Sequence, residues 1–430
     1  MPSSTETPAL EATESAPLGG DGSDAVAFLL RFTEVAHAAG YPTDDLEERV
    51  LAVAAHLGLA APQISSTPTL VELSFGTLAA QRSYTFRVRP QAVDLEAIAR
   101  LDDVVHDVVD GRIAPSEALD RLADIQSHPL HRHWLVRLAA YALAGAAVTP
   151  VLGGGWREIV SGGVVGLVVG GIALAAKRAA RTEVMLAPLA ALGASFCAAV
   201  IANLGLNASP DVVTLAALVT VLPGMALTIG VRELATEHLQ SGVANTAMAL
   251  VQLLGLVFGV GVGRSVAASW FGSPAQSVPH TAFSGTHVLA AIAAGLAFTV
   301  TLRAQSRAAP IMCAATVIAV IANASGRALF GAAAGVFFAA LAIGIIGGLV
   351  SGVGRRSPLV FIVPGVLILV PGSAGFNSLL KLLTGQTVSG IDAGFNTFVT
   401  AMSIAYGLML STVVLPRRFT GIGTSGAARA

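Results

Sequence analysis

The pattern of hydrophobic and polar positions changes near residue 130. Before that point, apolar residues recur at helical spacing or alternate with polar ones over short stretches, which is typical of a small soluble domain. After His133 they form long runs of Ala, Val, Leu, Ile and Gly. Ten such runs are separated by turn residues or charges: 134–152, 159–176, 184–202, 212–231, 243–263, 283–302, 308–325, 328–350, 357–375 and 393–416. Most approach the ~20 residues of a membrane-spanning helix, and they lack the alternation of β-barrel strands.

The first part of the chain predicts an α+β domain behind a polar tail. Residues 1–23 are rich in Ser, Thr, Glu and Gly without an apolar core, so we expect a disordered cytosolic tail rather than a signal peptide. The pattern predicts helices over 24–40, 44–58, 94–109 and 115–125, and a pair of strands over 68–76 and 83–90. These elements form a small cytosolic α+β domain over 24–130.

The composition supports this division. Of the 430 residues, 54% are hydrophobic and 12% are charged, against about 25% charged in an ordinary soluble domain. Residues 1–130 hold eight Lys and Arg against 20 Asp and Glu, whereas the rest of the chain holds 17 basic and six acidic residues. We therefore expect an acidic soluble domain joined to a membrane domain, with the lipid membrane and no nucleic acid as a partner.

Lys and Arg are distributed unevenly among the loops between the apolar runs. One set of alternate loops, together with the C-terminal tail, holds ten: Lys177, Arg178, Arg181, Arg232, Arg303, Arg307, Arg355, Arg356, Arg417 and Arg418. The other set holds four: Arg157, Arg264, Arg327 and Lys381. Since basic loops face the cytoplasm, we predict a multi-pass protein of the plasma (inner) membrane with both termini cytoplasmic.

Two Pro-Gly dipeptides occupy matching places in the two halves of the apolar region. Each is followed 18 residues later by Ser-Gly: Pro223-Gly224 by Ser241-Gly242, and Pro371-Gly372 by Ser389-Gly390. Each Pro-Gly falls in the fourth helix of a five-helix module, and each Ser-Gly opens the fifth. The two modules span 131–270 and 281–418, which leaves a C-terminal tail over 419–430. Five is an odd number, so the second module must be inverted in the membrane. The alternative is a chance similarity between Gly-rich segments.

The sequence thus predicts a polytopic α-helical membrane protein with about ten transmembrane helices as a 5+5 inverted repeat, an architecture of many secondary transporters. Its Pro-Gly dipeptides interrupt hydrophobic helices, where an unsatisfied carbonyl costs several kcal/mol unless protein or water faces it. The residues expected to line a substrate path are Pro223, Gly224, Pro364, Gly365, Pro371 and Gly372. A plain packing kink is the alternative.

A few polar side chains in the apolar region are candidates for chemistry. Asp392 is either a proton carrier or partner of a substrate ammonium, or an N-cap carboxylate; for Asp211 the cap fits better. Arg232 and Glu233 end the fourth helix, either as a gate or as an anchoring pair at the interface. The amides expected to line the substrate path are Asn245, Asn377 and Asn396, the last near the face of Asp392. Three further amides, Asn203, Gln252 and Asn323, are candidates to hydrogen-bond substrate or another helix.

No catalytic motif accompanies these residues. The sequence has no P-loop, no HExxH, no GxSxG and no paired intramembrane aspartates, and its cysteines, Cys197 and Cys313, lie far apart in apolar runs. We expect no enzymatic activity, no cofactor and no metal site. Without an ATP-binding module, transport must draw on an ion gradient or on the gradient of the substrate.

The stretch "LPGMALTIGVRELATEHLQSGVAN", 222–245, resembles the signature of the threonine/serine exporter (ThrE-like) family, with its Pro-Gly, Arg-Glu-Leu and Ser-Gly elements. The segments 93–125 and 361–372 are similar to the cytosolic domain and the second five-helix module of that family. The family pattern often has Asn at the position of Ile229 and Arg at that of Asn245, so these departures bear on the substrate. The resemblance covers roughly residues 25–418.

This resemblance implies a secondary active transporter that exports threonine and serine, driven by the proton motive force. In this hypothesis the Pro-Gly breaks line the substrate site, Arg232 and Glu233 gate its inner side, and Asp392, with Asp211 as a second candidate, couples protons. The alternatives are an exporter of another small amino acid or metabolite, and a membrane-anchored sensor or scaffold with a partner-binding cytosolic domain. Homo-oligomer formation is left open.

Overall fold

The computed structural model of the chain describes residues 20–59, 62–76, 81–88, 93–128, 130, 132–176, 183–206, 208–272, 284–354, 357–369 and 371–415. Most of the predicted N-terminal tail and the whole predicted C-terminal tail lie outside these residues. So do seven of the basic residues that predict the orientation: Lys177, Arg178, Arg181, Arg355, Arg356, Arg417 and Arg418.

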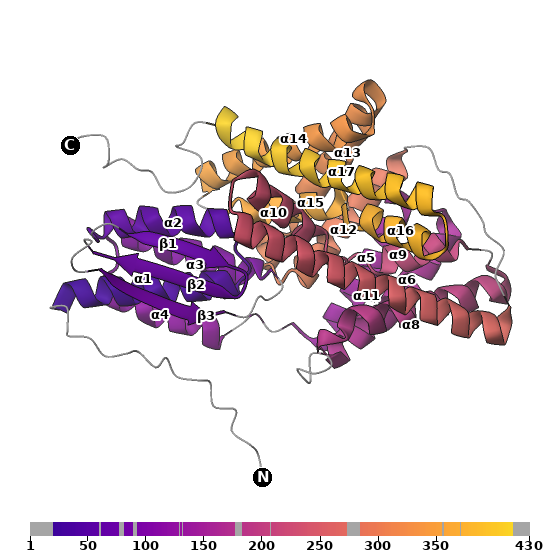
Figure 1. Cartoon of the computed structure of the whole chain (residues 1–430), viewed down its shortest axis with the longest axis horizontal. Coiled ribbons are helices and arrows are strands. Elements are labelled where there is room, and N and C mark those ends of the chain that lie inside the picture. The colour runs from indigo at the N-terminus through magenta and orange to yellow at the C-terminus, as the bar shows by residue number, and fades with distance from the viewer. Residues whose placement is uncertain are drawn as a thin grey trace, which may run out of the picture.

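The described N-terminal domain combines helices with a three-stranded antiparallel sheet in the order β1-β2-β3 (Figure 1). Its elements are α1 (Gly20–Ala38), α2 (Thr43–His56), β1 (Gln63–Thr67), β2 (Leu70–Phe75), β3 (Arg82–Arg87), α3 (Leu95–Val109) and α4 (Pro115–Ser127). The helices and the β2–β3 pair match the sequence pattern. The pattern missed β1 because its residues, QISST, are mostly polar and only Ser66 is fully buried. The core is continuous from α1 to α4 through Phe28, Phe32, Leu73 and Leu101.

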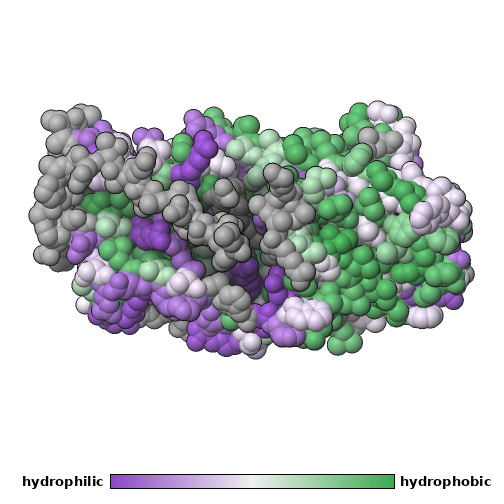
Figure 2. Space-filling view, turned by 90° about the horizontal axis from the view of Figure 1, so that it is seen from below, coloured by the Kyte–Doolittle hydropathy of each residue, from purple (hydrophilic) through white to green (hydrophobic). Residues whose placement is uncertain are grey.

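The rest of the described chain is helical. Its elements are α5 (Trp134–Val151), α6 (Trp156–Ala176), α8 (Leu186–Ile201), the π-helical turn η1 (Ala202–Leu206), α9 (Pro210–Ala217), α10 (Gly224–Ala235), α11 (Leu239–Phe271), α12 (Gly285–Thr301), the short 3-10 helix η2 (Ser306–Ala308), α13 (Ala309–Phe330), α14 (Ala332–Gly354), α15 (Leu359–Leu369), α16 (Pro371–Leu383) and α17 (Thr387–Val414). Apolar residues cover this part, and hydrophilic residues gather over the N-terminal domain (Figure 2).

Eight helical stretches in the described residues are long and apolar enough to cross a membrane, against ten predicted runs. The two other runs also form helices. One is α12, whose 17 residues are slightly short for a span. The other, 212–231, is divided into α9 and α10 by a non-helical stretch that ends at Pro223. The multi-pass character is therefore confirmed, and the difference in number comes from the predicted Pro-Gly break and from one short helix.

The two Ser-Gly dipeptides meet the same neighbours in the two halves. Each lies in the first turn of a long helix, α11 or α17, which turns back from α10 or α16. A Cβ added at Gly242 would lie 2.8 Å from the backbone nitrogen of Leu234, and one added at Gly390 would lie 3.0 Å from that of Leu382. Both pairs are separated by eight residues. Only glycine permits this approach of the two helices without a shift in the backbone.

The first helices of the two halves lie side by side with opposite directions relative to the N-terminal domain. The backbone N–H of Leu95 donates to the carbonyl of Leu302, at the end of α12, over 3.0 Å. Arg132, just before α5, donates to the carbonyl of Ala304 over 2.7 Å. The start of α5 and the end of α12 therefore share one side of the molecule, next to the N-terminal domain. Correspondingly, the α10–α11 turn lies beside that domain, whereas the α16–α17 turn lies at the opposite end (Figure 1).

We predict that Gly242→Ala and Gly390→Ala each lower the thermal unfolding temperature of the detergent-purified chain. The added Cβ would overlap a backbone nitrogen, and overpacking of this kind costs about 1–3 kcal/mol. Gly261→Ala is the matched control, since a Cβ there meets nothing within 4 Å; it should leave the temperature unchanged or raise it. Equal behaviour of the three variants would contradict this packing.

Candidate functional site

The break at Pro223-Gly224 separates two short helices inside the helical part of the molecule. Helix α9 ends at Ala217, and α10 begins at Gly224 with Pro223 as its N-cap residue. Proline lacks the N–H that would continue the helical ladder, and its ring excludes the preceding turn. The carbonyls between the two helices therefore need partners outside the helix. Pro223 and Gly224 are both buried, so these partners lie inside the molecule and not in lipid.

Side chains supply part of what the break removes. The Gln252 side chain, on α11, donates from Nε2 to the carbonyl oxygen of Val221 over 2.9 Å. Within the first turn of α10 the Thr228 hydroxyl donates to the carbonyl of Gly224 over 2.9 Å, which reinforces the start of the helix after the break. A buried carbonyl left without a partner would cost about 1–3 kcal/mol. Gln252 thus stabilises the non-helical backbone around Val221, which an apolar side chain at position 252 could not do.

The two matched Pro-Gly breaks are in direct contact. A Cβ added at Gly372 would lie 3.1 Å from the nitrogen of Gly224 and 3.2 Å from its Cα. It would also lie 3.2 Å from Cβ of Leu222. Because neither glycine has a side chain, the ends of α10 and α16 approach backbone to backbone. Dipeptides 148 positions apart in the sequence thus meet in the interior, and the structure places Pro223, Gly224 and Gly372 together.

The third predicted break does not interrupt its helix. Pro364 lies inside the continuous helix α15, and both Pro364 and Gly365 are buried. A Cβ on Gly365 would meet the Ile343 side chain of α14 at 2.9 Å. Here the packing of α14 on α15 accounts for the glycine. Pro371 is the first residue of α16, so a break at the second dipeptide is compatible with the described elements.

Two hydroxyls near the first break have no hydrogen-bond partner in the described part of the chain. They are Oγ1 of Thr214, on α9, and Oγ1 of Thr220, within the break, and both are buried atoms. A buried hydroxyl without a partner is unfavourable, and most such groups in native proteins are satisfied by protein, water or a ligand. Sequence reasoning did not single out these threonines. Both threonines precede Pro223 closely in the sequence, and this proximity to the Pro-Gly dipeptide was the available signal.

Arg232 and Glu233 lie where α10 meets the N-terminal domain. Arg232 forms an ion pair with Asp45, on α2, with 2.8 Å between Nη2 and Oδ1. Glu233 is fully buried and accepts a hydrogen bond of 2.7 Å from the Asn245 side chain. Of the three expected pathway amides, only Asn245 therefore joins a predicted gate residue. The Arg-Glu pair holds the C-terminal end of α10 against another domain, as either a gate or an anchor would.

Further contacts extend this junction along the α10–α11 turn. His238 lies 3.2 Å from the Glu47 carboxylate, measured from Nε2 to Oε2. The Ser241 hydroxyl donates to the backbone carbonyl of Ser66 over 2.5 Å. The residues of the N-terminal domain that make these contacts were not predicted from the sequence. The excess of acidic residues in that domain was the signal that could have suggested them.

The environment of Glu233 perturbs its titration. This residue lies beyond the apolar run that ends at residue 231. Desolvation by burial raises the pKa of the Glu233 carboxyl, whereas hydrogen bonds from Asn245 and Thr43 lower it, and the net direction is upward. Raised carboxyl pKa values are common at functional sites, where a group must take up and release a proton. Glu233 is therefore the candidate carboxyl with the clearest physical reason to bind a proton.

The other predicted polar residues lie apart from the two breaks. Asp211 pairs with Arg264 near the end of α11 that is far from the N-terminal domain. Asp392, Asn396 and Asn377 are exposed side chains on α16 and α17, so they face lipid, water or another molecule and not the described core. No hydrogen bond or ion pair joins Asp392 to another described residue. The structure thus does not gather Asp392, Asn377 and Asn396 around Gly224.

Comparison with known proteins covers almost the same span as the described fold. A family model of threonine/serine exporters matches residues 27–267, and a second one, "Threonine/Serine exporter, ThrE", matches residues 286–414. The threonine/serine exporter of Corynebacterium glutamicum is 22% identical over 90% of this chain and 81% of its own length. Pheromone-regulated membrane protein 10 of Saccharomyces cerevisiae is 25% identical over 90% of this chain but only 52% of its own length. No solved structure shows a significant match.

We predict that the stability of the chain falls as the pH rises through the titration of Glu233. The pKa of Glu233 is higher in the folded protein than its ordinary value of 4.5. Between these two values the native state binds more protons than the unfolded chain, so protonation stabilises the fold there and the contribution is lost on ionisation. Glu233→Gln should flatten this dependence in thermal unfolding scans from pH 4.5 upward.

Glu72→Gln is the matched control, because Glu72 is an exposed carboxylate on β2. It should leave the slope of unfolding temperature against pH as in the wild type. If both variants keep the wild-type slope, the buried carboxyl does not titrate in the way that its environment indicates.

Proposed function

The chain belongs to the threonine/serine exporter family, and from this membership we propose that it exports small hydroxy-amino acids, threonine and serine, as a secondary active transporter. The observation that carries the proposal is the contact between the two Pro-Gly breaks at Gly224 and Gly372. Broken helices that meet inside a bundle offer backbone groups to a small polar substrate, as in other secondary transporters. The relative from Corynebacterium glutamicum is named for the same substrates.

The two halves of the helical part are proposed to be an inverted repeat. Three observations support this: the direct contact of the matched breaks, the equivalent approach of Gly242 to Leu234 and of Gly390 to Leu382, and the opposite directions of α5 and α12. In such a repeat, rocking of one half against the other exposes a central site alternately to the two sides. The contact of Gly224 with Gly372 is then the pivot region between the halves.

The N-terminal domain is proposed to lie in the cytoplasm and to act at the inner end of the path. Its contacts through Asp45 and Glu47 hold the α10–α11 turn, which must move if α10 rocks. Arg232 and Glu233 thereby serve as the inner gate. Of the charged candidates, Glu233 is the proposed site of proton coupling, because its buried carboxyl binds a proton more readily than an exposed one. Asp392 and Asp211, at the other end, are proposed to act in outer gating.

We predict that the purified chain in proteoliposomes catalyses threonine counterflow, and that an imposed pH gradient increases net flux. Serine should compete, whereas amino acids with large apolar side chains should compete poorly. Failure to move any amino acid, together with retained binding of a protein partner by the N-terminal domain, would favour the sensor or scaffold alternative.

Gly372→Val should reduce counterflow about tenfold or more without changing insertion into the membrane. The valine side chain would push Gly224 and Leu222 away and separate the two breaks, and a displacement of about 1 Å near a site can cost 10²-fold in rate. Gly261→Val is the control, since it places the same side chain on α11 in open space. Unchanged flux in Gly372→Val would remove the breaks from the transport path.

A further inference from the structure

A cavity of about 580 Å³ lies at the junction of the N-terminal domain with the helical part, away from the Pro-Gly breaks. Its apolar lining is formed by Leu95, Ala99, Ala304, Ala308 and Val360. Helix α3 contributes one side, and the connection between α12 and α13, with the start of α15, contributes the other. The cavity is large enough for a free amino acid, and both parts of the molecule form its walls.

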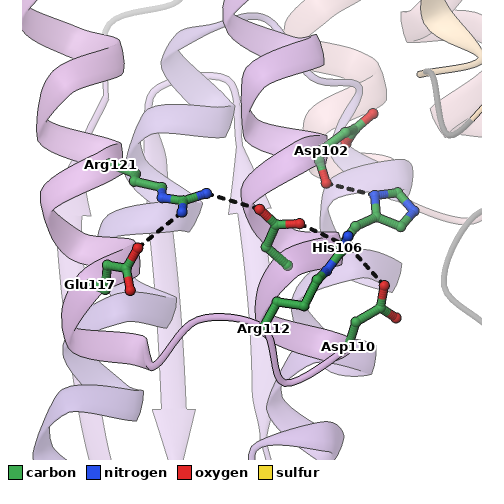
Figure 3. A network of polar contacts seen from close by, with 7 residues as sticks. Asp102, His106, Asp110, Arg112, Glu117 and Arg121 are labelled. Carbon is green, nitrogen blue, oxygen red and sulfur yellow. Dashed lines mark hydrogen bonds and ion pairs between the residues drawn. The ribbon is translucent and has the colours of Figure 1, made fainter.

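Two of the arginines at this cavity are already engaged. Arg112 and Arg121 both form ion pairs with Asp107, at 2.8 and 2.9 Å. Arg112 also pairs with Asp110 over 2.8 Å, and Arg121 with Glu117 over 2.9 Å. Figure 3 shows this network between the side chains of α3, α4 and the turn that joins them. These charges balance one another within the N-terminal domain, so they are not free to hold a ligand.

The remaining charges of the cavity are one acid and one base on different walls. Asp103 belongs to α3, and Arg307 belongs to η2, between α12 and α13. Neither forms a hydrogen bond or an ion pair with another residue of the described ranges. Both side chains are exposed at the mouth of the cavity. Partial burial raises the pKa of the Asp103 carboxyl, and the charge of Arg307 offsets part of this rise. The two groups therefore act on each other across the cavity without direct contact.

We propose that this cavity binds a free zwitterionic amino acid, with its carboxylate on Arg307 and its ammonium group on Asp103. A singly charged ligand would satisfy only one of the two groups, whereas an α-amino acid carries both charges on one carbon. The apolar lining accommodates its side chain. Charge-assisted hydrogen bonds of this kind are the stronger ones in proteins. The proposal rests on the proposed function only for the choice of threonine as the probe.

A bound amino acid would join the two parts of the molecule. Asp103 belongs to the N-terminal domain and Arg307 to the connection between α12 and α13, and these two parts also meet through the hydrogen bond of Leu95 with Leu302 and the ion pair of Asp94 with Arg303. The same domain holds the α10–α11 turn through the ion pair of Asp45 with Arg232. Occupancy of the cavity therefore favours one position of the domain over that turn, since a ligand shifts an equilibrium toward the state that it binds better. The site is regulatory and separate from the transport path.

The test is equilibrium dialysis of radiolabelled L-threonine against the purified full-length chain in detergent. The wild type should bind two equivalents, one at the breaks and one at the cavity. Asp103→Asn and Arg307→Gln should each weaken one site by about tenfold or more, the effect of losing a hydrogen bond to a charged group. Asp120→Asn and Arg157→Gln are matched controls, because both charges are exposed and neither residue lines the cavity, and they should bind two equivalents.

Two analogues of threonine, and a double variant in which the acid and the base change places, keep the test independent of any single variant. On the wild type, N-acetyl-threonine lacks the ammonium group and threonine amide lacks the carboxylate, so neither should displace threonine from the cavity. The double variant Asp103→Arg/Arg307→Asp should regain binding, because the zwitterion can turn around. Threonine binding that is unaffected by Asp103→Asn and Arg307→Gln would overturn the proposal. So would displacement of threonine from the cavity by either analogue to the same extent as by unlabelled threonine.

The outcomes separate this proposal from the proposed function. If the chain does not transport amino acids, counterflow is absent and the wild type binds one equivalent, which Asp103→Asn removes. If the cavity does not bind amino acids, counterflow persists and the single equivalent is insensitive to Asp103→Asn but is lost in Gly372→Val. Absence of all binding and of counterflow would overturn both.

Discussion

The rest of the helical architecture depends on the contact of Gly224 with Gly372. A break in a membrane helix frees backbone groups that lipid cannot satisfy, so it must face protein or water. Here the two breaks face each other, and the lack of a side chain at either glycine lets α10 and α16 approach to van der Waals distance. Gln252 reaches from α11 to the freed carbonyl of Val221. The break is thus held by α11, so the position of α11 is coupled to the conformation of the break.

Close packing through small residues transmits that arrangement outward. Gly230 of α10 lies against Thr246 of α11, where a Cβ would be 2.5 Å from the threonine hydroxyl oxygen. In the second half Ser378 stands at the position that matches Gly230, and Gly394 stands at the position that matches Thr246, so the glycine and the hydroxyl residue change places. Ser378 donates over 2.7 Å to the carbonyl of Gly390 and leaves room only for a glycine at 394. Each helix pair therefore combines one glycine with one hydroxyl residue. In the absence of a hydrophobic driving force between helices, such packing and hydrogen bonds supply the association energy.

The sequence was sufficient for the helices but not for which side of each helix faces the protein. Every apolar run forms a helix or a pair of helices, and the proline at 223 begins α10 as its chemistry requires. The exposed position of Asp392 was not predictable, because α17 is apolar on nearly all sides and carries little periodic signal of which side faces the protein. Helix α16 does carry such a signal, since its polar residues Asn377 and Lys381 are four positions apart. The contact of Asp45 with Arg232 joins residues 187 positions apart, and charge balance alone could not select that partner. Strand β1 was missed because it is polar and short.

The two halves differ in the turns that join their last two helices, α10–α11 and α16–α17. The α10–α11 turn carries Arg232, Glu233 and His238, and the acidic N-terminal domain lies on it. The matching positions of the α16–α17 turn are Leu380, Lys381 and Gln386, which lack the basic pair that binds Asp45 and Glu47. An inverted repeat with identical ends would open equally well to either side, since the two states that open to opposite sides would have the same free energy. A domain that binds only one turn adds free energy to only one of these states. In the proposed exporter, charges at the turns, rather than the shared helical core, are therefore what distinguishes one side of the path from the other.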